Sequence, residues 1–124
     1  MSKGEINSAK DVHQKRVNIV NCLPDNVFVE PGQSTPESAK AAMESLGRAI
    51  EDLKEGHIDV LVTGPINKRA MVGEGFGYTG HTEYLEKEFG VDEVAMIMVC
   101  DNLKVGVATG HIPLKEVPAA LSTE

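Results

Sequence analysis

The sequence predicts an α/β fold in which helices pack on a largely parallel sheet. Short apolar runs alternate along the chain with helical patterns, the order typical of helices covering a sheet. The run IDVLV at residues 58–62 is nearly continuous in apolar residues, as in strands buried on both faces. Polar, glycine-containing segments follow two of the runs, where α/β sheets bind ligands at the carboxyl ends of their strands.

In the first half of the chain, the clearest element is a helix from about Thr35 to Glu55. Ser34 or Thr35 can cap it, Pro36 suits its first turn, and Gly56 suits its end. Its apolar residues recur at spacings of three and four, which predicts one buried stripe: Ala39, Ala42, Met43, Leu46, Ala49, Ile50 and Leu53. Before it, residues 16–22 (RVNIVNC) predict a strand, and no clear element is expected up to about Lys15.

Three further strands and two helices are expected in the second half. The strands are predicted at 58–62 (IDVLV), 94–99 (VAMIMV) and 103–108 (LKVGVA), all three of them buried. A short helix is predicted at 82–89, with Leu85 and Phe89 on one face, and another helix begins after Pro113.

Composition limits the classes of function. With 124 residues the chain is one domain at most, and its net charge of -7 disfavours binding to nucleic acid. A base-stacking surface is also unexpected, because only 4% of the residues are aromatic. No apolar run approaches the roughly 20 residues of a membrane span. Cys22 and Cys100 both lie in apolar runs and are predicted to be buried thiols. We therefore expect a cytoplasmic protein.

His81 and Thr82 are the first candidate site residues. Nearby glycines let the backbone approach a ligand closely, and a helix that begins near Thr82 would present free N–H groups to an anion. An imidazole and a hydroxyl group at that place could hold a hydroxy acid or a phosphate. The alternative is structural: Thr79 or Thr82 caps the helix, and His81 only packs beside it. Spacing alone leaves both interpretations open.

His111 and Lys68 also follow predicted strands. A neutral imidazole held by the turn at Ile112 and Pro113 suits a metal ligand or a proton shuttle. No second ligand has a recognisable spacing, and the alternative is that His111 has only a structural role, as a lone histidine more often does. Lys68 could balance a phosphate charge, although TGPINK lacks the spacing of a P-loop, and a surface lysine at a turn before a helix explains it equally well. His13 and His57 are expected to be solvated.

Three segments together resemble the 4-hydroxythreonine-4-phosphate dehydrogenase (PdxA) family. They are TGPINK, GYTGHTEYL and TGHIPLKEVP, in this order, with an apolar strand between the last two. The resemblance covers residues 32–121. It implies the fold of the isocitrate and isopropylmalate dehydrogenases, present here in part, with the active site in a cleft at a homodimer interface.

The resemblance also implies roles for single residues. His81 and Thr82 would bind the substrate, 4-phosphohydroxy-L-threonine, in pyridoxal phosphate biosynthesis. His111 would be one of three histidine ligands to a divalent metal, whether Zn, Mg or Co. The metal would lower the pKa of the substrate alcohol, NAD or NADP would take the hydride, and the resulting β-keto acid would lose CO2. No general acid or base and no nucleotide-binding residue is assigned within this chain.

Members of the family are more than twice as long as this chain. Their amino-terminal TPGEPAGIGPE-type segment has no counterpart here, nor does the carboxyl-terminal part with two metal histidines, further phosphate contacts and the NAD site. We therefore expect residues 1–124 to be a central fragment that binds substrate and metal, contributes to dimerisation and is inactive alone. Two alternatives are a related dehydrogenase of 4-phospho-D-threonate or 4-phospho-erythronate, and a non-catalytic dimerisation fragment. An exposed apolar patch on an edge strand, or on the helix after Gly80, would favour the latter.

Overall fold

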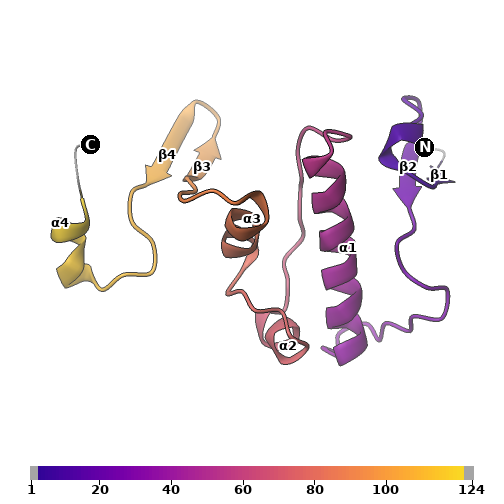
Figure 1. The fold of residues 1–124 in the computed structure, drawn as a ribbon, viewed down its shortest axis with the longest axis horizontal. Coiled ribbons are helices and arrows are strands. Elements are labelled where there is room, and N and C mark those ends of the chain that lie inside the picture. The colour runs from indigo at the N-terminus through magenta and orange to yellow at the C-terminus, as the bar shows by residue number, and fades with distance from the viewer. Residues whose placement is uncertain (1–2, 122–124) are drawn as a thin grey trace. The chain divides into compact units, whose positions relative to one another are not determined.

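The computed structural model of the protein describes residues 3–121. It divides into two compact units, residues 1–90 and residues 91–124, and Figure 1 shows their helices and strands. The architecture mixes helices with strands, and the strands form two separate two-stranded sheets, one of them parallel. The larger unit contains the long helix and the segments that carry His81 and Thr82.

The first unit begins with the parallel sheet. Strand β1 (Lys3–Ile6) pairs with β2 (Val17–Val20), and a short 3-10 helix, η1 (Ala9–Asp11), lies between them in sequence. The strand predicted at 16–22 is confirmed. The expectation of no element before Lys15 is wrong, because β1 and η1 both lie there. Strand β1 contains one large apolar residue, Ile6, too few to give a strand pattern in the sequence.

Helix α1 (Pro36–Lys54) confirms the clearest prediction. Thr35 and Ser38 form a reciprocal cap: the Ser38 N–H donates to Thr35 Oγ1 at 3.1 Å, and the Thr35 N–H donates to Ser38 Oγ at 3.1 Å. Pro36 occupies the first turn. Gly56, just past the helix, has a φ of +71°, a left-handed conformation that favours glycine and turns the chain away from the helix.

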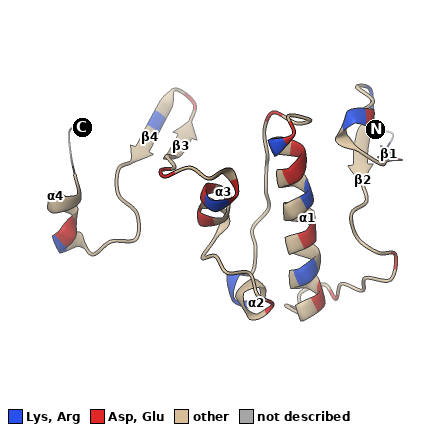
Figure 2. Cartoon of the chain, in the orientation of Figure 1, with Lys and Arg blue, Asp and Glu red and all other residues tan. Residues whose placement is uncertain are grey.

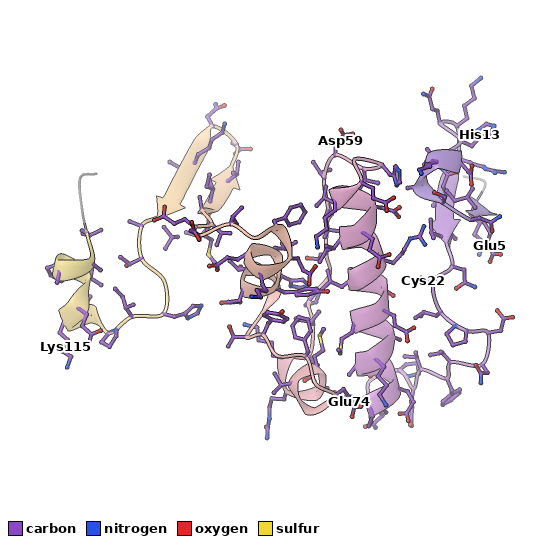
Figure 3. The ribbon with its side chains drawn as sticks, viewed as in Figure 1. Glu5, His13, Cys22, Asp59, Glu74 and Lys115 are labelled. Carbon is purple, nitrogen blue, oxygen red and sulfur yellow. The ribbon has the colours of Figure 1, made fainter. Side chains whose placement is uncertain are left out.

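The core of this unit forms where α1 meets two shorter helices, α2 (Lys68–Gly73) and α3 (His81–Phe89). The buried residues that contact one another are Ala39, Leu46, Ile50, Met71 and Phe76. Helix α3 confirms the prediction at 82–89, whereas α2 is a helix that the sequence reading missed. The side chain of Asn67 caps α2 by accepting from the Ala70 N–H at 3.1 Å. A salt bridge of 3.1 Å between Lys40 on α1 and Glu74, which follows α2 and is labelled in Figure 3, also joins these helices.

The strand predicted at 58–62 is wrong. These residues lie outside every helix and strand, and Val60 and Val62 are 74% and 91% exposed. Leu61 is the residue of this run that packs against the core. A strand requires hydrogen bonds to a neighbouring strand, and none of the described strands pairs with this segment.

The second unit is built on an antiparallel hairpin of β3 (Met96–Cys100) and β4 (Leu103–Val107), in which Met96 lies opposite Val107. Both strands were predicted, but not their antiparallel pairing. The burial predicted for 94–99 and 103–108 is also wrong, because every residue of both strands is exposed. Cys100 is therefore exposed and not a buried thiol, and Cys22 is half-buried; both are free. The helix expected after Pro113 is confirmed by η2 (Leu114–Glu116) and α4 (Val117–Ala120).

No helix in the described part of the chain is both long enough and apolar enough to cross a bilayer.

Candidate functional site

His81 and Thr82 are the first two residues of α3. The N-cap is Gly80, whose backbone is fully extended and which has no side chain to accept from the helix. The structural alternative, with Thr79 or Thr82 as the cap, is therefore wrong. Thr79 precedes the cap, and Thr82 is already inside the helix. The side chains of His81 and Thr82 are half-buried, so each is partly accessible to a ligand.

Three aromatic rings hold the segment that leads into this helix. Phe76 is buried and packs edge-on against Tyr78 and Tyr84, at centroid distances of 5.3 and 5.0 Å. Tyr78 and Tyr84 also contact each other at 5.0 Å. Because the rings flank residues 79–81 on both sides in sequence, they fix the backbone that presents His81. The sequence reading did not identify this cluster.

Burial raises the pKa of Tyr84, and the negative charge of Glu88 raises it further. The positive charge of Lys54 acts in the opposite direction and is outweighed. The Tyr84 hydroxyl group therefore stays neutral at physiological pH, and it contributes a packed ring and no charge beside the site.

A cavity of about 300 Å³ lies beside His81. The segment Thr63–Ile66 forms one part of its lining, and Ser45 and Leu46 of α1 form another. Three polar side chains reach it, those of His81, Thr63 and Ser45, in a lining that is otherwise mostly apolar. The structure thus brings Thr63–Ile66 of the TGPINK segment and His81 of the GHTE segment to one cavity, although the predicted strand before Thr63 is not formed. A few polar groups in an apolar cavity are typical of small-molecule sites.

His111 lies in the second unit, four residues after β4 ends at Val107. It is exposed, and its φ of +55° is in the left-handed region, uncommon for a residue other than glycine. Within residues 3–121, no group of three His, Cys, Asp or Glu side chains is placed to hold a metal. His111 by itself does not form a metal site, because a catalytic zinc ion takes three protein ligands.

The remaining histidines, His13 and His57, differ in their exposure to solvent. His13 is exposed, as expected. His57 is not solvated as predicted: its side chain is only 15% exposed, and Nδ1 lies 3.3 Å from Asp52 Oδ1 and 3.2 Å from Glu55 Oε2. After Gly56 the chain folds back, and the His57 N–H donates to the Asp52 carbonyl at 2.8 Å. This backbone bond draws the ring onto the carboxylate.

Comparison with known proteins agrees with this picture. The family model described as "Pyridoxal phosphate biosynthetic protein PdxA" matches residues 2–124. The chain belongs to the PdxA family. A relative from Bacteroides thetaiotaomicron named 4-hydroxythreonine-4-phosphate dehydrogenase is 41% identical over 120 residues, 96% of this chain and 33% of the relative. One of the same name from Aquifex aeolicus is 45% identical over 96 residues, 77% of this chain and 29% of the relative. This PdxA-family chain thus spans about a third of the length of the relatives it matches.

Solved structures give the same result. A 4-hydroxythreonine-4-phosphate dehydrogenase from Klebsiella pneumoniae superimposes with a TM-score of 0.79 at 28% identity, over 94% of this chain and 37% of that one. The enzyme of this name from Burkholderia phymatum has a TM-score of 0.73 at 32% identity, over 94% of this chain and 36% of that one. The similarity extends over both units of the PdxA-family chain. More than half of each solved chain lies outside the match.

Proposed function

We propose that this chain forms the central, substrate-binding part of a dehydrogenase that uses NAD to oxidise and decarboxylate 4-phosphohydroxy-L-threonine in pyridoxal phosphate biosynthesis. The observation that carries this proposal is the cavity where His81 meets the Thr63–Ile66 segment, in a chain of the PdxA family. The names of the relatives supply the substrate class. The partial isocitrate dehydrogenase-like fold, the homodimer and the cytoplasmic location belong to the same proposal.

His81 and Thr82 would orient the substrate. They are consecutive residues in the first turn of α3, and their imidazole and hydroxyl groups can hydrogen-bond the polar groups of a hydroxy acid. The apolar side chains of Leu46 and Leu61 line the neighbouring cavity and would exclude water from one side of it. Holding a reactant in one geometry lowers the entropic part of the barrier, and this is the contribution we assign to the two residues.

His111 would contribute one imidazole to a divalent metal, Zn, Mg or Co. Since the described residues provide no cluster of three ligands, the remaining ligands would come from outside residues 3–121. No residue of this chain is proposed to bind the nucleotide. When bound, NAD or NADP would accept the hydride.

A chimera tests the proposal. Residues 3–121 would replace the matching third of the Bacteroides thetaiotaomicron relative, so that the rest of an enzyme of this name surrounds them. We expect the chimera to reduce NAD with 4-phosphohydroxy-L-threonine. His81→Ala should then lower kcat/KM by about 100-fold, since misplacing a bound reactant costs about this much. His111→Ala should weaken metal affinity, and excess metal should restore part of the rate.

A folded chimera in which His81→Ala and Thr82→Ala retain full kcat/KM would contradict the roles of these residues. Equal metal affinity before and after His111→Ala would contradict the metal ligand. His13→Ala is the matched control, because His13 is exposed and distant in sequence from all three segments. Assays with 4-phospho-D-threonate and 4-phospho-D-erythronate identify the substrate: a higher kcat/KM with either would replace the one proposed.

A second candidate, a non-catalytic interaction fragment, is favoured by the hairpin. Its two strands are almost without charged side chains (Figure 2). Every large apolar residue of the two strands is exposed: Met96, Ile97, Met98, Val99, Leu103, Val105 and Val107. Analytical ultracentrifugation of the 124-residue chain tests this candidate. A dimer that Ile97→Lys dissociates would support it, and a monomer at all concentrations would contradict it.

A further inference from the structure

Lys68 is the feature of the TGPINK segment that the proposed function leaves unexplained. It is the first residue of α2, and its side chain lies along Gly80, the residue directly before His81 and Thr82. A methyl group placed on Gly80 would lie 3.6 Å from both Cε and Nζ of Lys68. Gly80 is buried although its neighbour Thr79 is exposed. The ammonium group therefore lies directly beside the backbone that leads into the two substrate residues.

Lys68 and Thr79 also share a second cavity, of about 500 Å³, which is shallow and widely open to solvent. Arg69 lines it as well, with the small and apolar residues Val72 and Gly73. The TGPINK segment thus has two sides: Thr63–Ile66 lines the cavity of His81, and Lys68 lines the cavity of Thr79. Both cavities adjoin the loop that ends at Gly80.

Although the net charge of the whole chain is -7, positively charged side chains lie at the start of α2. Two cations, Lys68 and Arg69, begin α2, and one carboxylate faces the same glycine: Glu83 Oε2 would lie 3.2 Å from a methyl group on Gly80. Both groups lie against the same glycine, and the ammonium group of Lys68 supplies a positive charge there. At physiological ionic strength this charge is felt within about 8 Å, so a ligand held by His81 and Thr82 lies within its range.

We propose that Lys68 is a substrate-binding residue that holds an anionic oxygen group of the ligand beside His81 and Thr82. Lysine binds phosphate and carboxylate as a flexible point charge, and its long side chain can follow the ligand without movement of the backbone. The inference rests on the proposed function for the identity of the ligand. The position of Lys68 beside Gly80 is independent of that function.

The test is a titration of the 124-residue chain followed by NMR at the amides of residues 80–82. The probes are 4-phosphohydroxy-L-threonine, inorganic phosphate, and 4-hydroxy-L-threonine, which has the carboxylate but no phosphate. Lys68→Met removes the charge and keeps most of the length, and Lys68→Arg keeps the charge. The matched control is Lys87→Met, which removes the same charge from an exposed position at the other end of α3.

We expect Lys68→Met to weaken binding of the phosphorylated substrate by about tenfold, the lower range for a hydrogen bond to a charged group. Lys68→Arg and Lys87→Met should stay within about twofold of the original chain. A loss with inorganic phosphate but not with 4-hydroxy-L-threonine identifies the phosphate as the bound group, and the reverse identifies the carboxylate. Equal affinity in Lys68→Met and Lys87→Met, or no binding of any probe, would overturn the inference.

The outcomes separate this inference from the proposed function. Substrate binding that depends on His81 but not on Lys68 overturns the inference and leaves the function standing. Binding of inorganic phosphate that depends on Lys68, without any binding of the substrate, supports the anion site and contradicts the substrate. The NMR spectrum of each variant shows whether it remains folded.

Discussion

At the scale of single residues, Asp52 carries a buried charge near the end of α1. Its side chain is 10% exposed and accepts from Arg48 Nε at 3.3 Å, with His57 Nδ1 also at 3.3 Å. Burial raises the pKa of this carboxyl group, but the hydrogen bonds to His57 and Arg48 and the charge of Arg48 outweigh that effect. The pKa therefore lies below its ordinary value. The Asp52 carboxylate therefore connects the end of α1 to His57, in the segment that follows the helix.

The acid stability of the chain should depend on Asp52. Because its folded pKa is below the unfolded value of about 3.9, its contribution is present above that pH and is lost as the pH falls through the folded pKa. Asp52→Asn should lower the free energy of unfolding by about 1–2 kcal/mol at pH 6 and by much less at pH 3. Urea unfolding at both values measures this. Asp59→Asn is the control, since Asp59 is exposed just past α1 (Figure 3), and an equal loss in both variants would refute the prediction.

At the scale of elements, the rings of Phe76, Tyr78 and Tyr84 connect the loop before α3 to the core. Replacing Tyr84 with Leu removes two ring contacts at 5.0 Å and keeps an apolar side chain. The free energy of unfolding should fall by about 1–2 kcal/mol, since each such pair contributes about 0.5–1.5 kcal/mol beyond burial. Tyr84→Phe keeps the rings and should cost much less. Thermal unfolding measures both, and equal losses would mean that the hydroxyl group and not the ring matters.

Tyr84→Phe should also change the response to alkali. A folded pKa above the ordinary value means that the contribution of Tyr84 to stability is complete below about pH 10 and is lost as the pH rises through the folded pKa. The difference in unfolding free energy between the original chain and Tyr84→Phe should therefore shift in favour of the variant above pH 10. Urea unfolding at pH 8 and pH 10.5 measures the shift, and Tyr78→Phe is the comparison. A constant difference would contradict this expectation.

Elements defined by local sequence were predictable, and those defined by distant partners were not. Helix α1 has its stripe, its cap at Thr35 and its stop at Gly56 within one stretch, and it forms within one residue of the prediction. The run at 58–62 has the composition of a buried strand, but pairing depends on other strands that sequence does not place. The hairpin had a readable signal: the two residues between β3 and β4 are Asp101 and Asn102, and Asp101 adopts a φ of +47°.

In the candidate site, too, features with a local sequence signal were predicted and features that depend on distant contacts were missed. Resemblance selected His81, Thr82 and His111, and periodicity placed the helix that begins at His81. The ring cluster was missed because residues 76, 78 and 84 share no helical or strand period. The approach of Lys68 to Gly80 was missed because it depends on the packing of α2, a six-residue helix whose only sequence signal is the capping Asn67.

At the scale of the whole molecule, the chain is short relative to the proteins that it matches. It spans 33% of the Bacteroides thetaiotaomicron relative, and the described residues provide one histidine near a strand end and no metal cluster. We expect the purified 124-residue chain to give no measurable NAD reduction with 4-phosphohydroxy-L-threonine at any divalent metal concentration. A spectrophotometric assay of NADH formation measures this, with the chimera as the positive control. Turnover by the chain alone would contradict the proposal that the other metal ligands and the nucleotide site lie outside residues 3–121.

The two units should also differ in stability. In the first, α1 is packed against two other helices, and Ile50 and Met71 are each only 1% exposed. In the second, a two-stranded hairpin exposes every residue of both strands, and such a hairpin alone is marginally stable in water. Amides of the hairpin should therefore open with a free energy lower by about 2 kcal/mol or more than the amide of Ile50, and exchange at least about 30-fold faster after correction for intrinsic rates.

Native-state hydrogen exchange followed by NMR measures this difference. The amides that pair β3 with β4 are compared with those inside α1, at two protein concentrations that differ by tenfold. If hairpin protection rises with concentration, copies of the chain cover its apolar face; if it stays low, the hairpin opens on its own. Protection equal to that of Ile50 at the lower concentration would show that the exposed strands are stable without a covering surface, and would contradict the prediction.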